Sequence, residues 1–210
     1  MIPGIVSSEL RETILDYLDT TFSFQDGSVS SALEGFLRDS THGIFKGPYV
    51  SLRLPYRRGE ASESERLLEV RPGFRPFVHQ ILSFERLTSK DGHQPQHTVV
   101  TSGTGSGKTE CYLYPVLDHC LRRAGRPGVK AVILYPMNAL ASDQARRFAQ
   151  EIWGDPRLRG RVTAGMYVGG HGDDRTMGPE NVITDRDTLR NHPPDILMTN
   201  YKMLDYLMIR

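Results

Sequence analysis

The stretch Thr101-Ser-Gly-Thr-Gly-Ser-Gly-Lys-Thr-Glu110 decides how this chain folds. Three glycines alternate with small polar residues, so backbone N–H groups can approach an anion without obstruction by side chains. The apolar residues that follow recur at helical spacing as far as Arg123, and the positive end of that helix would face the same anion. The preceding residues 97–101 form an extended apolar stretch that predicts a strand. The order strand, glycine loop, helix is the context that a phosphate-binding loop requires.

The predicted loop runs over residues 102–109 and fits the triphosphate of ATP. Lys108 is expected to meet the β- and γ-phosphates, and the hydroxyl of Thr109 to hold a magnesium ion. Backbone amides would complete the grip on the phosphates, and they belong to Thr104, Gly105, Ser106 and Gly107. Ser102 stands where the strict pattern has glycine, and a small residue suffices there. The alternative is a flexible Gly/Ser linker with a chance Lys-Thr pair.

Composition limits the remaining choices. Apolar residues make up 38% of the 210 residues, which supports one domain with an appended segment. The net charge of +1 provides no overall positive field, so contact with nucleic acid has to come from local patches. Cys111 and Cys120 lie nine residues apart on one predicted helix, hence on opposite faces, where they cannot bridge. We therefore expect a reduced, cytoplasmic protein, and we expect no membrane association because no segment approaches spanning length.

The first third of the chain, residues 1–70, is predicted to be an accessory extension of helices and loops. The expected elements are a helix over about 7–19, a short helix over 30–38, an alternating stretch at 51–54 and a polar surface linker at 59–66. None of these elements carries chemistry by its spacing. The domain that does so is expected to span residues 71–210.

Strands and helices alternate in that second domain. Buried strands are predicted over residues 131–135, 162–168 and 195–199. A helix is expected after the first, a polar loop through Pro194 after the second, and a helix from about Tyr201 after the third. This alternation predicts an α/β fold, a doubly wound and mostly parallel sheet with right-handed crossovers. Ligands bind such sheets at the carboxyl ends of the strands. Four turns are expected there, namely the phosphate loop, Pro136-Met137-Asn138, Gly169-Gly170 and Thr199-Asn200, and together they offer more surface than a nucleotide fills.

One glutamine precedes the loop by about two dozen residues. The side chain of Gln80 offers an acceptor and two donors, the complement of the adenine edge. The alternative is a solvated glutamine at the start of a helix.

Five motifs in one order then resemble those of superfamily 2 DEAD/DEAH-box helicases over about residues 70–210. They correspond to the Q motif, motif I, motif Ia, the paired-glycine motif and motif Ib, and they read here as residues 73–80, 102–109, 136–144, 169–170 and 199–201. The residues of motifs Ia and Ib most resemble those of large bacterial helicases of the DNA-repair and phage-defence type. Gly47-Pro48-Tyr49-Val50 looks like the leader region of these helicases.

The resemblance implies a RecA-like domain of an ATP-dependent helicase or translocase that acts on DNA rather than RNA. Gln80 would read adenine, while Lys108 and Thr109 would hold ATP and Mg²⁺. Contacts to the nucleic-acid backbone, without base specificity, would come from Pro136, Asn138, Gly169, Gly170, Thr199 and Asn200. The alternative for residues 136–138 is a sharp turn with a capping asparagine, and for residues 199–200 it is a helix cap.

The family's next motif, Asp-Glu-x-His, is absent from these 210 residues, as is a second RecA-like domain. We therefore expect an incomplete sheet that lacks the motif II strand, with an exposed edge at Val99 and Val100. We also expect a chain that binds nucleotide without turning it over and that is completed by a C-terminal helicase half or a split partner. Two other classes stay open: a P-loop ATPase switch that is not a helicase, and a non-catalytic regulatory or interaction fragment.

Overall fold

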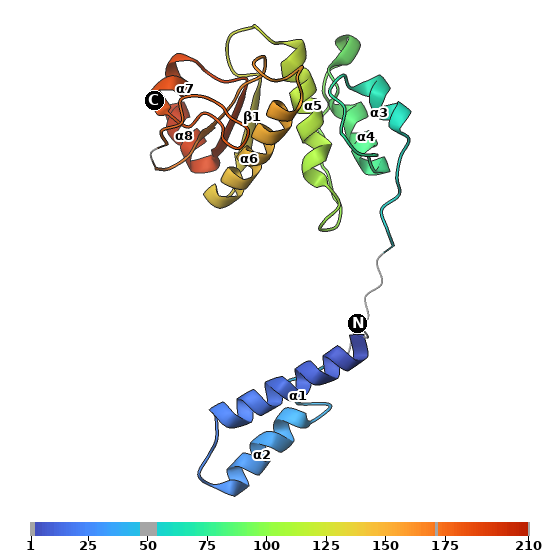
Figure 1. The fold of residues 1–210 in the computed structure, drawn as a ribbon, viewed down its shortest axis with the longest axis vertical. Helices are drawn as coiled ribbons and strands as arrows, with labels where there is room; N and C mark the ends of the chain where they lie inside the picture. Colours follow the sequence, from blue (N-terminus) through green and yellow to red (C-terminus); the bar gives the residue numbers. More distant parts are fainter. Residues whose placement is uncertain (1–2, 47–53, 171, 210) are drawn as a thin grey trace. The chain divides into compact units, whose positions relative to one another are not determined.

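The computed structural model describes residues 3–46, 54–170 and 172–209 and divides the chain into two compact units, Met1–Pro55 and Tyr56–Arg210 (Figure 1). The leader-like segment at 47–50 and most of the alternating stretch at 51–54 lie outside the described residues. The predicted boundary at residue 70 falls within the second unit.

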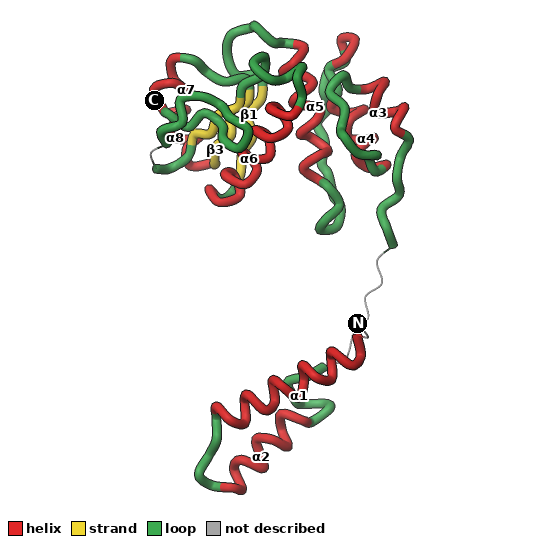
Figure 2. The backbone as a smooth tube through the Cα atoms, viewed as in Figure 1, coloured by secondary structure: helices red, strands yellow, loops and turns green. Residues whose placement is uncertain are grey.

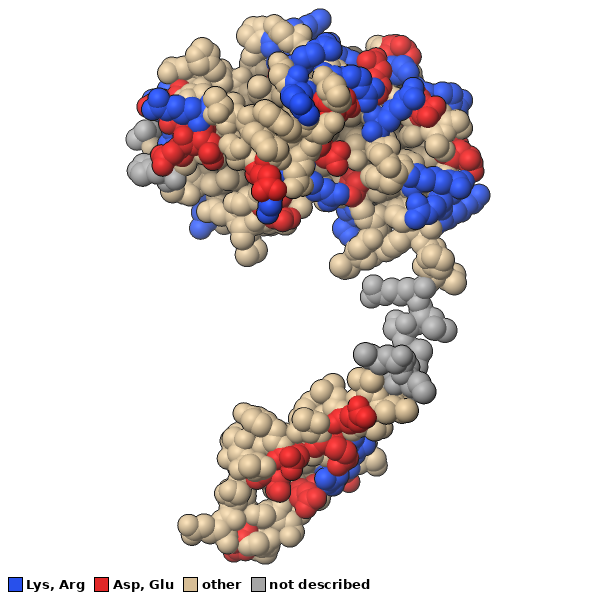
Figure 3. All heavy atoms as spheres, in the orientation of Figure 1, with Lys and Arg blue, Asp and Glu red and all other residues tan. Residues whose placement is uncertain are grey.

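The first unit is a pair of helices, α1 (Pro3–Thr21) and α2 (Gly27–Arg38), both of which begin earlier than the sequence indicated. Leu15 and Leu37 are buried between them, and Arg38 pairs with both Glu12 and Glu34. Residues 1–55 contain seven Asp and Glu against four Lys and Arg. Acidic side chains are visible along the hairpin in Figure 3.

The second unit begins with α3 (Ala61–Leu67), where the sequence analysis predicted a surface linker, and that prediction is wrong. The carboxylate of Glu63 accepts a hydrogen bond from the N–H of Glu60 at 3.2 Å and so stabilises the start of this short helix. Leu68 and Val70 follow immediately and are buried in the core of the second unit. This packing supports a helix that polar composition alone does not suggest.

Two packed helices carry the phosphate loop. They are α4 (Val78–Leu87) and α5 (Lys108–Arg122), with the short 3-10 helix η1 (Lys90–Gly92) between them. Helix α5 continues through Pro115 and is buried on opposite sides, since Cys111 and Cys120 are both fully buried. Both cysteines are free, in agreement with the sequence analysis.

The strand predicted over residues 97–101 is not formed, and this expectation is wrong. A strand needs a neighbour to take up its N–H and C=O groups, and within the described residues no strand lies beside this segment. Val99 is accordingly 87% exposed, as expected for an apolar residue at an uncovered edge. The phosphate loop is therefore held without a paired strand before it.

The sheet has three parallel strands, β1 (Ala131–Tyr135), β2 (Ala164–Tyr167) and β3 (Ile196–Asn200), in the order β1-β3-β2. These strands confirm the predicted parallel α/β architecture, and the whole is consistent with part of a RecA-like fold. Tyr135 pairs with Asn200 and Tyr167 with Thr199, so the three strands end at one edge. Figure 2 shows α6 (Asn138–Gly154) to one side of the strands, and α7 (Arg186–Asn191) and α8 (Tyr201–Ile209) to the other.

The two edges of the sheet differ. Ile183 forms an isolated parallel bridge to Gly165, so the segment before α7 extends the sheet beyond β2. The sequence predicts a polar loop through Pro194 here, and the bridge and α7 correct that prediction. At the opposite edge, Val132 and Leu134 of β1 are 50% and 49% exposed. Beneath the sheet, the predicted apolar face of α6 is buried at Ala141, Ala145, Phe148, Ala149 and Ile152.

Candidate functional site

The phosphate loop presents free backbone donors. Gly105 and Gly107 adopt positive φ angles of 76° and 73°, which non-glycine residues rarely take up. Within the described part of the chain, no other group accepts a hydrogen bond from the N–H groups of residues 104–107. Helix α5 begins directly after them at Lys108. Consecutive free donors at the start of a helix are what an anion requires.

Lys108 folds back over the loop. Its ammonium donates to the carbonyl oxygens of Ser102 and Gly103, each at 2.9 Å. Oxygens of a triphosphate can replace these two neutral acceptors, so the residues present fit the ligand that the loop predicts. Thr109 is a half-buried residue in the first turn of α5, directly after the loop. Within the described residues, no group of three or more His, Cys, Asp or Glu side chains could hold a metal ion. The role of Thr109 as a ligand for magnesium stays a prediction.

Two side chains of helix α4 bind the backbone of the phosphate loop. The amide of Gln80 accepts from the N–H of Phe77 at 2.8 Å and donates to the carbonyl of Gly107 at 3.0 Å. The ring of His79 lies 2.9 Å from the carbonyl of Ser106. Gln80 is only 1% exposed, so in this arrangement its amide positions the loop, and its reading of adenine stays a prediction. No sequence pattern marks His79 by itself, although its place next to Gln80 is a usable signal.

A second group of predicted residues gathers at the carboxyl ends of the strands. Asn200 donates to the side-chain carbonyl of Asn138 at 2.7 Å, which joins the turns after β1 and β3. Gly169 lies beside Asn138, because a Cβ added there would be 3.9 Å from the asparagine nitrogen. Thr199 is fully buried, and its hydroxyl donates to the carbonyl of Tyr167. Three of the four predicted turns therefore form one surface.

The residues of these three turns differ in exposure. Pro136 and Asn138 are exposed, and Met137 rather than Asn138 caps helix α6. Thr199 supports the turn after β2 from within, so its own contact with a ligand stays a prediction.

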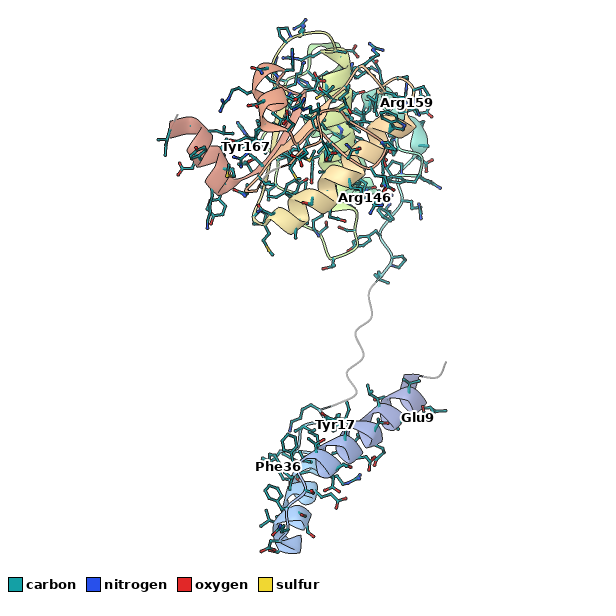
Figure 4. All side chains as sticks on the ribbon, turned by 60° about the vertical axis from the view of Figure 1, so that its left-hand side comes forward. Glu9, Tyr17, Phe36, Arg146, Arg159 and Tyr167 are labelled. Carbon is teal, nitrogen blue, oxygen red and sulfur yellow. The ribbon has the colours of Figure 1, made fainter. Side chains whose placement is uncertain are left out.

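An arginine that the sequence analysis missed fixes the turn after β2. The guanidinium of Arg186 donates to the carbonyl of Gly170 at 2.8 Å and to that of Val168 at 3.5 Å. It also stacks over the ring of Tyr167, labelled in Figure 4, at 5.3 Å from the ring centre. Gly170 has a φ of 103°, a conformation that favours glycine. No sequence pattern marked Arg186, because its role depends on the fold of the region before α7.

Side chains of α5 and α6 connect the two groups. Glu110 pairs with Arg147, and the hydroxyl of Tyr114 donates to Glu151 at 3.3 Å. Burial, together with the neighbouring Glu151, raises the pKa of Tyr114 above its ordinary value, so this hydroxyl stays protonated. Helix α5, which follows the phosphate loop, and helix α6, which begins at Asn138, are thus joined by side-chain contacts.

Comparison with known proteins agrees with this geometry. The family model for DEAD/DEAH box helicases matches residues 78–210. The chain is 29% identical to Druantia protein DruE of Escherichia coli (strain UMEA 4076-1) over 86% of its length and 11% of the relative's. It is 26% identical to the uncharacterized ATP-dependent helicase MJ1574 of Methanocaldococcus jannaschii, over 83% of this chain and 24% of that one.

A shorter match involves a DEAD-box ATP-dependent RNA helicase 29 of Oryza sativa, which is 26% identical over half of this chain and 12% of the relative. The chain therefore spans about a quarter or less of the length of these relatives. None of the helices in the described residues is long and apolar enough to cross a membrane.

Proposed function

This chain belongs to the DEAD/DEAH box helicase family, and we propose that it is the ATP-binding part of a DNA helicase or translocase. Members of this family use ATP, generally with a divalent metal, and act on nucleic acids. The observation that carries the proposal is the row of free N–H donors at residues 104–107, directly followed by Lys108 at the start of α5.

Each residue of the loop has a distinct part in this proposal. The amides of residues 104–107 and the ammonium of Lys108 bind and orient the phosphates, and the hydroxyl of Thr109 contributes one ligand to magnesium. Gln80 and His79 hold the loop in its shape through Gly107 and Ser106. We also propose that the second N–H of the Gln80 amide donates to adenine. ATP with Mg²⁺ supplies the free energy for movement along the nucleic acid.

Nucleic acid would lie across the carboxyl ends of the strands. Pro136, Asn138, Gly169, Gly170 and Asn200 offer small or amide groups there, which suit the sugar–phosphate backbone and carry no base specificity. Buried Thr199 would contribute mainly by supporting the turn of Tyr167 and Gly169. We favour DNA over RNA and a role in phage defence, because the residues of motifs Ia and Ib resemble those of large bacterial helicases of the DNA-repair and phage-defence type. Two buried free thiols fit a reducing cytoplasm.

We further propose that the chain by itself does not hydrolyse ATP appreciably. Its 210 residues contain no Asp-Glu-x-His sequence to activate water. Among the described strands β1 lies at the edge of the sheet, and its Val132 and Leu134 are half exposed on one face. We propose that a further strand from the remaining helicase half or from a split partner pairs with this edge.

The decisive experiment is calorimetric titration of the purified chain with ATP–Mg²⁺. We expect binding that Lys108→Gln weakens at least about tenfold, since a charge-assisted contact is lost. Lys90→Gln is the matched control, because Lys90 also donates to a backbone carbonyl, that of Arg66 at 2.8 Å, but belongs to η1. Failure of the unmodified chain to bind ATP–Mg²⁺ would refute the proposal, and hydrolysis at several per second would refute the predicted inactivity.

Binding to labelled single-stranded DNA and RNA of equal sequence tests the substrate. Backbone contacts predict an affinity for DNA that falls steeply with salt and does not depend on base sequence. Tighter binding of RNA would reverse the assignment to DNA.

A further inference from the structure

Two polar side-chain contacts join α5 and α6. Glu110 of α5 pairs with Arg147 of α6, and four residues further along each helix Tyr114 meets Glu151. Four residues are about one helical turn, so both contacts lie on one face of each helix and the helices advance in the same direction. Glu110, in the contact with Arg147, lies in the first turn of α5, next to the phosphate loop.

The carboxylate of Glu110 is turned toward this loop. One of its oxygens, Oε1, accepts from Arg147, while Oε2 is buried and has no hydrogen-bond partner within the described residues. A Cβ added at Gly107 would lie only 3.0 Å from Oε2, so this oxygen borders the loop backbone itself. The Glu110 side chain is 12% exposed, and water therefore screens its charge only weakly.

Such a carboxylate opposes the binding of a phosphate chain of like charge. Arg147 is the cation that pairs with it, and its own side chain is 37% exposed. The neighbouring Arg146 pairs instead with Glu180, where both side chains are more than half exposed. Two successive arginines of α6 thus hold carboxylates in different settings, and only Arg147 acts beside the loop.

We propose that Arg147 is a positioning residue for nucleotide binding, which neutralises Glu110 and holds its carboxylate in place beside the phosphate loop. This inference rests on the proposed binding of ATP by that loop. Helix α6 also begins at Asn138, whose side chain is bound by Asn200. A displacement of α6 caused by nucleic acid would therefore reach the nucleotide through the pair of Arg147 and Glu110.

Titration calorimetry with ATP–Mg²⁺ and ADP–Mg²⁺ tests this on four forms of the 210-residue chain: the unmodified protein, Arg147→Gln, Arg146→Gln, and the double variant Glu110→Gln with Arg147→Gln. We expect Arg147→Gln to weaken ATP binding about tenfold, the order of size for one unpaired charge close to a nucleotide of like sign. The loss should be smaller for ADP, which carries less charge. Arg146→Gln should stay within about twofold of the unmodified protein, because its ion pair is exposed.

The double variant separates charge from structure. It removes the carboxylate together with the arginine, so it should regain ATP affinity to within about twofold of the unmodified protein. The inference is overturned if Arg147→Gln binds ATP normally, if ATP and ADP lose affinity equally, or if the double variant stays weak. If the unmodified protein itself ignores ATP–Mg²⁺, the proposed function fails, and that result is read from one titration without any variant.

Discussion

Replacement of Gly107 by alanine tests how tightly the phosphate loop is built. Gly107 has a φ of 73°, and an added Cβ would lie 2.5 Å from the amide nitrogen of Gln80. Heavy atoms that are not bonded do not approach so closely, so the Gln80 amide has to move. That movement breaks the hydrogen bond from Gln80 to the carbonyl of Gly107, at a place where Gln80 is almost fully buried.

The expected cost has two parts. A left-handed conformation costs a non-glycine residue about 1–2 kcal/mol. A displaced, buried amide that loses its partner adds about 1–3 kcal/mol. Gly105 supplies the matched control, because its φ is 76° but nothing lies within 4 Å of an added Cβ. Gly105→Ala should therefore show only the first part, and Gly107→Ala should be less stable than Gly105→Ala by about 1–3 kcal/mol.

Urea denaturation followed by tryptophan fluorescence measures this difference. The chain has a single tryptophan, Trp153 in α6, so the signal reports on the second unit alone. The midpoint of thermal unfolding should fall by about 2–4 °C for each kcal/mol lost in a unit of this size. Equal destabilisation by the two substitutions would show that Gln80 yields without cost, and it would refute the role of Gln80 in positioning the loop.

Three further predictions concern other parts of the second unit. Asp118→Ala should lower the free energy of unfolding by about 3–5 kcal/mol, because buried Asp118 binds Arg122 and two backbone N–H groups. The control Glu180→Ala removes a carboxylate from an exposed ion pair and should cost less than about 1 kcal/mol, so comparable losses would contradict this prediction. Arg186→Gln should weaken DNA binding about tenfold and Arg190→Gln, an equal charge change one helical turn on, much less; equal losses would mean that only charge matters. Burial raises the pKa of Cys111 to about 11 and of Cys120 to about 12, both from about 9, so the contribution of the thiols to the free energy of unfolding should be constant below about pH 9 and fall from about pH 9 to 12. Denaturation at pH 8 and 11 checks this, and an equal fall in Cys120→Ala would exclude that thiol as a source.

Periodicity predicted the elements whose burial is local to one sequence window. The continuous apolar runs became β1 and β3, and the spacing of Ala141, Ala145 and Phe148 correctly placed the buried face of α6. Because parallel strands end at one edge, the meeting of Asn138 and Asn200 also followed from the sequence. These predictions succeeded because each depends on short-range pattern and on one rule of topology.

Features that depend on a distant partner were not predicted. Residues 97–101 have the composition of a strand, but composition does not supply the neighbouring strand that would bind their backbone. Helix α3 is polar along its length and is stabilised by Leu68 and Val70, which lie beyond its end. Arg186 reaches the carbonyl of Gly170 because the segment before α7 lies against β2.

Because residues 97–101 do not form a paired strand, other contacts hold the phosphate loop in place. In a complete sheet a paired strand would fix the start of the loop, whereas here Lys108 bonds to the carbonyls of residues 102 and 103, while α4 holds residues 106 and 107 through His79 and Gln80. A triphosphate that takes Lys108 away from those carbonyls would release the first half of the loop, unless a further strand secured it. The free energy of loop ordering would then oppose nucleotide binding. Pairing of a strand along the open edge of β1 should therefore tighten ATP binding as well as complete the sheet, and the two effects should appear together when a completing partner is added.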